Sequence, residues 1–249
     1  MDKSQYIGIT ETSDPCFHLE LFDNLYDGNI IVTKNLSNKL IEKLIENKDK
    51  CILHCTCTGF GGSKIEPFVP TVEQTVKKIE KLIDGGFPVK QIVLRIDPIV
   101  PTDKGVETAK NVLKAFQKFG VQRVRISFLD MYKHVKERFN DADVKLPYES
   151  FHADMKLRHK AYRDLCECAY EYGYYHVYSC GEPGFTETPC ISQMDIDILG
   201  LTDKIKLVDK KGQRSTCFCP SNKRQLISWE ESRKKCGHEC LYCYMKNDE

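Results

Sequence analysis

The chain has 249 residues, of which 41% are hydrophobic and 29% are charged, and its formal net charge is +1. This length and composition predict one domain with a substantial core. The near-zero charge argues against a protein whose overall field attracts nucleic acid, although a local basic patch is compatible with it. No run of about 18 apolar residues occurs and the N-terminus lacks the apolar segment of a secretory signal, so we expect a soluble, cytoplasmic protein with no membrane partner.

The cysteine content is high for such a protein, with thirteen in the chain. A reducing compartment keeps thiols free, and a chain of this length does not need disulfides to fold. The cysteines therefore point to metal or redox chemistry.

Expected strands and helices alternate along the chain. In chain order we expect a strand at 6–10, a helix at 17–26, a strand at 29–33, a helix at 38–46, a strand at 51–58, a helix at 72–83, a strand within 91–101, a helix at 106–119, a strand at 123–128, a helix at 151–172, a strand at 175–179, a helix at 192–199, and short strands at 204–208 and 225–229. Repeated βα units favour a parallel sheet in a single α/β domain over residues 1–249, closed or partly closed into a TIM-like barrel.

Polar residues follow most of the expected strands. In such folds the active site lies where the C-terminal ends of the strands meet, so these residues are expected to converge on one mouth. For any one of them, a satisfied polar residue at the start of a loop is an equally good explanation. The residues concerned are Glu11, Ser13 and Asp14, then His54, Cys55 and Cys57, then Arg95 and Asp97, then Asp130, Tyr132 and Lys133, and finally Cys180 and Glu182.

The C-terminal stretch CGHECLYCY holds three cysteines, Cys236, Cys240 and Cys243, spaced C-x3-C-x2-C. A structural zinc site needs four ligands, commonly supplied as two pairs. His238 is a candidate fourth ligand, but its place between two of the cysteines makes a shared metal hard to reach. Three thiolates without a fourth therefore indicate an incomplete ligand set.

This CxxxCxxC loop, with Tyr242 before its last cysteine, resembles the cluster loop of radical S-adenosylmethionine (radical SAM) enzymes. The resemblance implies that the three cysteines bind a [4Fe-4S] cluster whose fourth iron is open to S-adenosylmethionine. It also implies that a 5′-deoxyadenosyl radical abstracts hydrogen from a substrate, and that Tyr242 lies beside the adenine. The stretch from KKIEKL to TDKG, with its Arg-x-Asp-Pro strand end, resembles the barrel of spore photoproduct lyase and its relatives.

In most of that superfamily the cluster loop follows the first strand, whereas here it ends the chain, as expected of a circularly permuted core with its cluster-binding segment at 213–249. Nearly the whole chain resembles the uncharacterised bacterial family of unknown function numbered 1848. The resemblance runs through GITETSDPCF, CTCTGFGGSKIEPFVP, LRIDPIVPTDKG, RISFLDMYKHVKERF and CGHECLYCY. The family commonly has Ser-Arg-Arg-Thr-Asp where this chain has Thr-Glu-Thr-Ser-Asp. What the two arginines bind in the family is therefore not expected to carry over, and a different substrate is compatible with this chain.

Other cysteines are candidates for a second iron–sulfur cluster or a metal. Cys217 and Cys219 precede the cluster loop, and they would need two further thiolates from among Cys55, Cys57, Cys180 and Cys190. Cys55 and Cys57 are two apart on a strand, so they share a face, which we expect to look into the barrel mouth. The alternative is that buried cysteines act as small hydrophobic residues.

Candidate pocket residues come from the strand ends. Gly181 and Glu182 offer a backbone turn and a carboxylate for the methionine ammonium group, and Arg95 either meets the methionine carboxylate or holds Asp97 in an ion pair. We expect the cofactor to contact Tyr242, Gly181, Glu182, Arg95, Glu11 and Asp14, and catalysis to involve Arg95, Asp97, Asp130 and Glu182. The turn GFGG at 59–62 is a weak phosphate-binding signal, and a turn beside a cluster explains it equally well.

The expected function is that of a radical SAM enzyme acting on an unknown substrate, with a flavodoxin or ferredoxin as electron donor. The segment 204–235 is rich in Lys and Arg, which indicates either a solvated face or contact with a nucleotide, a nucleic acid or another anionic molecule. The alternative from another class is a non-catalytic iron–sulfur or zinc protein, acting as a redox sensor or as a nucleic-acid-binding module.

Overall fold

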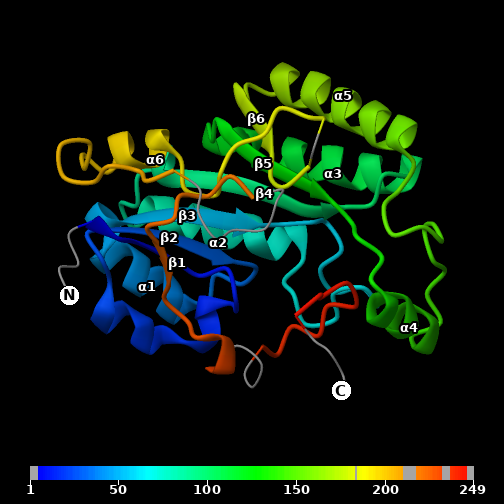
Figure 1. Cartoon of the computed structure of the whole chain (residues 1–249), viewed down its shortest axis with the longest axis horizontal. Helices are drawn as coiled ribbons and strands as arrows, with labels where there is room; N and C mark the ends of the chain where they lie inside the picture. The colour runs from blue at the N-terminus through cyan, green and yellow to red at the C-terminus, as the bar shows by residue number, and fades with distance from the viewer. Residues whose placement is uncertain (1–4, 183, 210–216, 232–235, 246–249) are drawn as a thin grey trace.

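The computed structural model describes residues 5–182, 184–209, 217–231 and 236–245. At its centre is a sheet of seven strands, all paired in parallel, in the order β6-β5-β4-β3-β2-β1-β7 (Figure 1). The strands are β1 (Ile7–Ile9), β2 (Gly28–Thr33), β3 (Cys51–Thr56), β4 (Ile92–Ile99), β5 (Arg123–Phe128), β6 (His176–Ser179) and β7 (Lys223–Gln225).

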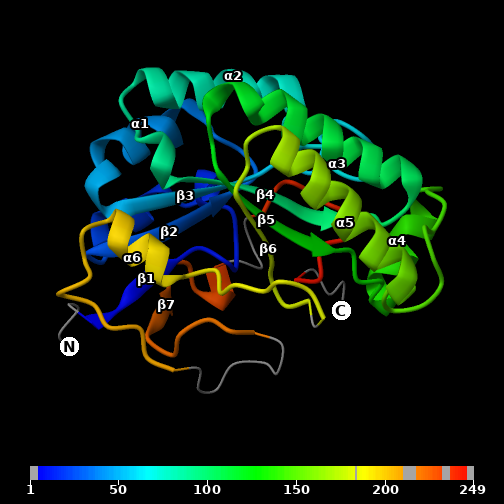
Figure 2. The same cartoon turned by 90° about the horizontal axis from the view of Figure 1, so that it is seen from above.

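Helices cover the two faces of the sheet unequally. Four of them, α1 (Asn38–Glu46), α2 (Val72–Asp84), α3 (Asp103–Phe116) and α5 (Met155–Glu171), lie on one face (Figure 2). The short α6 (Gln193–Ile198) lies on the other face, and α4 (Lys133–Asp141) lies beyond the C-terminal end of β5. We call these two faces the helix face and the α6 face.

Local capping explains where the helices begin and end. The Ser37 side chain accepts a hydrogen bond from the Leu40 N–H at the start of α1, and Thr71 and Gln74 form a reciprocal capping box at the start of α2. After α2 the chain turns at Gly86, whose φ of +89° favours glycine. These signals are local, and α1 and β5 accordingly match their expected bounds.

Strand alternation divides the core into two parts. Leu53, Cys55 and Leu94 belong to the cluster packed under the helices, whereas Ile52 and Val93 belong to the cluster beneath α6. Because neighbours along a strand point to opposite faces, every strand residue is assigned a face by its position. The sheet is therefore buried on both sides, as parallel sheets are.

The structure confirms a single α/β domain built on a parallel sheet, but the sheet is open. Within the described residues, β6 pairs only with β5 and β7 pairs only with β1, apart from an isolated bridge between Ser179 and Glu187. The expected TIM-like barrel, closed or partly closed, is not confirmed, because the described strands form a sheet with two open edges. The strand that precedes the C-terminal loop does lie beside β1, at one edge of the sheet.

Several expected elements differ in detail. The helix expected at 17–26 is replaced by two 3-10 helices, Pro15–Phe17 and Leu19–Asn24, because Asp14 and Pro15 start a tight turn and the His18 backbone breaks the helical conformation. The strand expected at 204–208 is not formed, and the one expected at 225–229 lies at β7, two residues earlier in the chain. Helix α4 was not expected. No helix in the described part of the chain has the length and apolar character needed to cross a membrane.

A buried ion pair joins the sheet to α6. Arg123 of β5 donates to the Asp195 carboxylate over 2.6 Å, and Asp195, with no exposed surface, also accepts from the Ser192 N–H and hydroxyl. We predict that Asp195→Asn lowers the free energy of unfolding by about 3 kcal/mol, because it leaves the Arg123 charge buried without its counter-ion.

Urea unfolding followed by circular dichroism measures this loss. The matched control is Glu80→Gln, which breaks a half-exposed pair with Lys118 and should cost less than about 1 kcal/mol. Equal losses in the two variants would contradict the prediction.

Candidate metal centre and strand-end site

The loop with Cys236, Cys240 and Cys243 lies at the C-terminal edge of the sheet, against the loop that follows β3. The Leu241 N–H donates to the Ile65 carbonyl over 3.0 Å, and Arg138 of α4 donates to the Cys243 carbonyl. Cys240 is buried, and its thiol feels the charges of Cys236 and Cys243. Burial raises the pKa of Cys240 to about 12, so binding a metal here must displace a proton.

His238, the candidate fourth ligand, is engaged elsewhere. Its Nε2 lies 2.8 Å from the Asp14 carboxylate, its Nδ1 lies 3.4 Å from the Phe68 carbonyl, and its ring packs against Phe17. Both ring nitrogens thus have partners within the protein. The three thiols are therefore the candidate metal ligands of the loop itself, while Asp14, Cys16 and His238 form a neighbouring group whose ligand atoms lie within 4.8 Å of one another.

Asp14 joins the first two strands to this loop. Its carboxylate accepts from the Thr33 hydroxyl at 2.7 Å, the Lys34 N–H at 2.7 Å and the Cys16 N–H at 3.0 Å, in addition to its contact with His238. Burial alone would raise the pKa of Asp14, but these hydrogen bonds and the charge of His238 hold it below its ordinary value. Asp14 is therefore an organising residue whose acceptor sites are already in use.

Lys34 and Glu66 form a mostly buried ion pair beside the loop. Lys34 Nζ lies 3.1 Å from Glu66, 3.3 Å from the Asp97 carbonyl and 5.2 Å from the centre of the Tyr242 ring, and the Tyr242 hydroxyl donates to Glu66. Burial lowers the pKa of Lys34, but Glu66 and Cys240 outweigh it and raise the pKa above its ordinary value. A fixed positive charge therefore stands next to the Cys240 thiol.

Arg95 and Asp97 lie together on the α6 face at the end of β4. Arg95 donates to the Asp97 carboxylate, and the Ser127 hydroxyl donates to its other oxygen. Burial would raise the pKa of Asp97, but the Arg95 guanidinium keeps it below its ordinary value. The Asp97 side chain retains 27% exposure, so this ionised carboxylate can still be reached by another molecule.

Two further expected pocket residues, Glu182 and Asp130, have partners of their own. Glu182, with Gly181 before it, is buried and accepts from the Phe128 N–H at 2.7 Å and from Arg158 of α5. Asp130 contacts the exposed His152 over 2.7 Å. Glu182 thus holds β5, α5 and the turn after β6 together, and both its oxygens have partners.

The candidate ligand cysteines separate into two groups. Cys55 and Cys57 share a face, as expected, but it is the helix face, where they are buried in the apolar core and not turned to the mouth. Cys217 and Cys219 lie on the α6 face with Cys190. Within the described residues, all thirteen cysteines are outside disulfides.

The basic segment is only partly described. Lys210, Lys211, Arg214, Arg233, Lys234 and Lys235 lie outside the described residues, as does Pro183. Lys223 turns inward to Glu11, over 2.7 Å, and the exposed Arg224 stacks on the Tyr6 ring. Of the described basic residues, Lys223 therefore does not contribute to an exposed surface, whereas Lys204, Lys206 and Arg224 are exposed.

Sequence reasoning missed Lys34 and Glu66. Lys34 follows β2, so the rule that selected the polar residues after other strands would have found it. Glu66 lies beyond the glycine-rich turn at 59–62, which is the turn beside the C-terminal loop and bridges back through Gly61. Its contact with Tyr242 spans 176 positions of the chain, and no local pattern predicts it.

Comparison with known families gives one match. A family model described as a domain of unknown function (DUF1848) matches residues 15–245. No curated protein matches the sequence.

The lowered pKa of Asp14 predicts an acid-dependent stability. Ionised Asp14 stabilises the fold above its ordinary pKa of 3.8, and this contribution is lost as the pH falls through its lower folded-state value. We predict that Asp14→Asn lowers the free energy of unfolding by on the order of 2 kcal/mol at pH 7, and that the difference from the wild type shrinks below about pH 4.

Urea unfolding of the metal-free protein at a series of pH values from neutral to acidic tests this expectation. Asp84→Asn, at an exposed position, serves as the control and should follow the wild-type curve. A deficit in Asp14→Asn that stays constant across the pH range would show that the carboxylate charge is not the cause.

Proposed function

The chain belongs to the family described as DUF1848, and we propose that it is a radical SAM enzyme whose [4Fe-4S] cluster is bound by Cys236, Cys240 and Cys243. The observation that carries the proposal is the engagement of His238 with Asp14. It leaves a three-thiol loop at the strand ends, with no fourth ligand from within the loop. This donor set fits a cluster with one iron left open, and it supplies only three of the four ligands of a closed zinc site. Asp14, Cys16 and His238, whose ligand atoms lie within 4.8 Å of one another, form the rival metal-ligand group beside it.

Strand order also supports the proposal. If the chain is read from β7 onward, the spatial order becomes β7-β1-β2-β3-β4-β5-β6, which is consecutive. The C-terminal loop then follows the first strand of the series, where the radical SAM resemblance implies it. In this proposal the open sheet takes the place of a partial barrel, with its α6 face as the interior.

When bound, such a cluster supplies the electron that cleaves S-adenosylmethionine to methionine and a 5′-deoxyadenosyl radical. The residues of this chain would then position the reactants. Lys34 places a positive charge beside Cys240, and Tyr242 is held over Lys34 by its bond to Glu66. We assign Asp97, with Arg95 and Ser127, to contact with cofactor or substrate, since it is ionised and partly exposed.

Asp14 and Glu182 take positioning roles in this proposal. Each is buried, and each carboxylate is already hydrogen-bonded on both oxygens by the protein. Releasing either one to bind the methionine part of the cofactor would leave Lys34 N–H or Arg158 without its partner, at a cost typical of unsatisfied buried groups. A flavodoxin or ferredoxin stays the proposed electron donor, and an anionic substrate, including a nucleotide or a nucleic acid, stays open.

Cofactor cleavage tests the proposal directly. We predict that protein reconstituted anaerobically with iron and sulfide shows the electron paramagnetic resonance signal of a reduced [4Fe-4S] cluster, and that added S-adenosylmethionine changes this signal. Dithionite should then yield 5′-deoxyadenosine. Cys240→Ala should abolish both the signal and the product, because it removes a cluster ligand.

The matched controls are Cys16→Ala and Cys55→Ala. Cys16 is the thiol whose pKa is raised in part by Cys236, so it is the nearest rival for a fourth ligand, and Cys55 lies on the helix face. Both variants should keep the signal and the product. A cluster that ignores S-adenosylmethionine, or zinc bound in its place, would instead support the non-catalytic metal protein.

The charge of Lys34 predicts a shift of the cluster's reduction potential. We expect Lys34→Met to lower the midpoint potential, because reduction adds negative charge and the variant lacks the cation that stabilises it. A redox titration followed by electron paramagnetic resonance measures the shift. Lys34→Arg keeps the charge and should stay near the wild-type potential, so equal shifts in both variants would count against an electrostatic role.

A further inference from the structure

A second group of thiols lies on the α6 face. Cys180 follows β6, Cys190 precedes α6, and Cys217 and Cys219 precede β7. The Cys180 and Cys190 Sγ atoms are 3.4 Å apart, the Cys190 N–H donates to Cys219 Sγ over 3.3 Å, and the Cys219 N–H donates to Cys217 Sγ over 3.5 Å. Four cysteines from three segments thus form one connected group.

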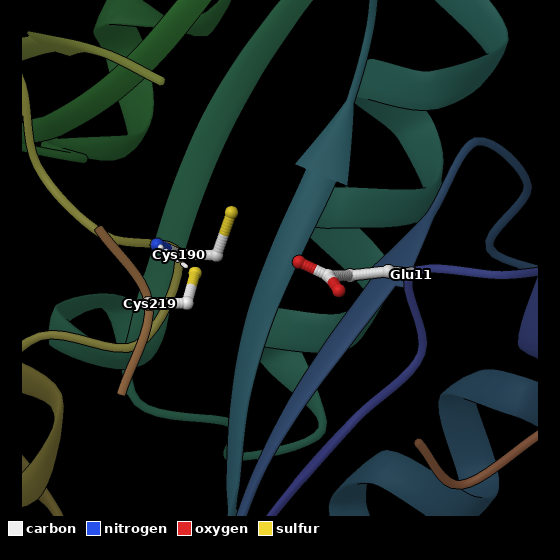
Figure 3. A group of neighbouring side chains, drawn as sticks. All are labelled: Glu11, Cys190 and Cys219. Atoms are coloured by element: carbon white, nitrogen blue, oxygen red, sulfur yellow. Dashed lines mark hydrogen bonds between the residues drawn. The ribbon is translucent and has the colours of Figure 1, made fainter. Parts of the chain in front are cut away.

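A carboxylate completes this group from the other side. The Glu11 side chain extends toward Cys190 and Cys219 from the end of β1 (Figure 3). One carboxylate oxygen of Glu11 and the two Sγ atoms lie within 4.8 Å of one another. The hydrogen bonds from Lys223 and Gln225 both go to Oε2, which leaves Oε1 with neither of them.

These spacings match a single tetrahedral ion. Four ligands around zinc at the zinc–sulfur distance of about 2.3 Å lie about 3.8 Å from one another. The ligand atoms of Glu11, Cys190 and Cys219 already lie within 4.8 Å of one another, whereas Cys180 is outside that set and touches only Cys190 of its members, at 3.4 Å, so its side chain must turn toward Glu11 and Cys219 to complete the tetrahedron. Cys190 is central, because it contacts both Cys180 and Cys219.

His54 gives an independent sign that something is bound here. Its side chain is fully buried, on the same face as Ile52, and neither ring nitrogen has a hydrogen-bond partner among the described residues. Its ring lies close enough to the Cys190 thiol for their charges to interact. Buried polar atoms without partners are rare, so the unpartnered His54 ring indicates that a further group belongs on this face beside Cys190.

We propose that Cys180, Cys190, Cys219 and Glu11 form a second metal site, which binds one tetrahedral thiophilic divalent cation of the zinc class. Four protein ligands make it a closed, structural site. It ties the turn after β6 and the segment before β7 to the end of β1, and so fixes the edge strand from which the C-terminal loop departs. This site does not depend on the proposed radical chemistry.

Metal content and cobalt binding test the proposal on the full chain. We expect the anaerobically purified protein to hold one zinc ion per chain by mass spectrometry, in addition to any iron. Metal-free protein titrated with Co²⁺ should develop the charge-transfer and d–d absorption of tetrahedral cobalt thiolate. Added Zn²⁺ should displace the cobalt and raise the melting temperature of the metal-free wild type.

Variants identify the ligands. Cys180→Ser, Cys219→Ser and Glu11→Gln should each weaken Co²⁺ binding by roughly 100-fold or more. Cys55→Ala, which removes a buried thiol from the helix face, should keep wild-type binding. Because a ligand variant can fail to fold, the zinc-dependent melting of the wild type provides a test that needs no substitution.

Three results would overturn the proposal: wild-type protein that binds neither zinc nor cobalt, a Cys180–Cys190 disulfide in the freshly purified protein, or cobalt binding that survives Cys180→Ser and Glu11→Gln. The Cys236→Ser/Cys240→Ser double variant separates this site from the cluster. It should lose iron and keep zinc, so the two proposals can fail independently.

Discussion

Strand-end geometry depends on the carboxylate of Asp14. This one group accepts hydrogen bonds from β2 and the residue after it, from the turn after β1, and from the ring of His238 in the C-terminal loop. These donors come from opposite ends of the chain. Because so many donors surround this buried carboxylate, ionising it costs little free energy. Its contact with His238 holds the loop in place.

That contact also determines the chemistry open to the loop. A histidine between two cysteines is an available zinc ligand whenever its nitrogens are free. With Nε2 held by Asp14, the thiols Cys236, Cys240 and Cys243 are left as an incomplete set, and the cation of Lys34 compensates part of the negative charge that they would carry when bound to iron. In the proposed function, the contact between His238 and Asp14 thus bears on which metal group the loop fits.

Local signals in the sequence predicted much of the fold. The amphipathic spacing and cap of α1 and the β-branched run of β5 are short-range features, and both elements have their expected bounds. The 3-10 turns at 15–24 depend on the hydrogen bond that the Cys16 N–H donates to the Asp14 carboxylate. This local bond outweighs the helical spacing of the apolar residues that follow. At 204–208, Ile205 and Leu207 pack in the apolar cluster beneath α6, and the Val208 carbonyl accepts a hydrogen bond from the Ser221 N–H, but the segment does not join the sheet.

The site was less predictable, since it depends on which face each residue occupies. Parity along β3 puts Cys55 and Cys57 on one face, but the sequence alone does not say which face carries the helices. Likewise, the sequence suggests that Glu182 is a pocket carboxylate, whereas in the structure it pairs with Arg158 of α5. No local sequence pattern predicts this pairing of two separate segments. Residues that follow a strand can be found from the sequence, as Asp14 and Asp97 were, but the long-range partners that decide their roles cannot.

The open sheet and the second thiol group have the same cause. Strands β6 and β7 lie at opposite edges, so the chain that leaves β6 must cross the whole α6 face before it can pair beside β1. That crossing carries Cys180, Cys190, Cys217 and Cys219 onto the α6 face. There it covers apolar strand side chains that, in a closed barrel, the barrel's own strands would enclose. A three-residue edge strand has few ladder bonds to hold it, and a long crossing of this kind has a high conformational entropy when it is free. A metal clip between its two ends and β1 would reduce that entropy where the C-terminal loop most needs a fixed anchor.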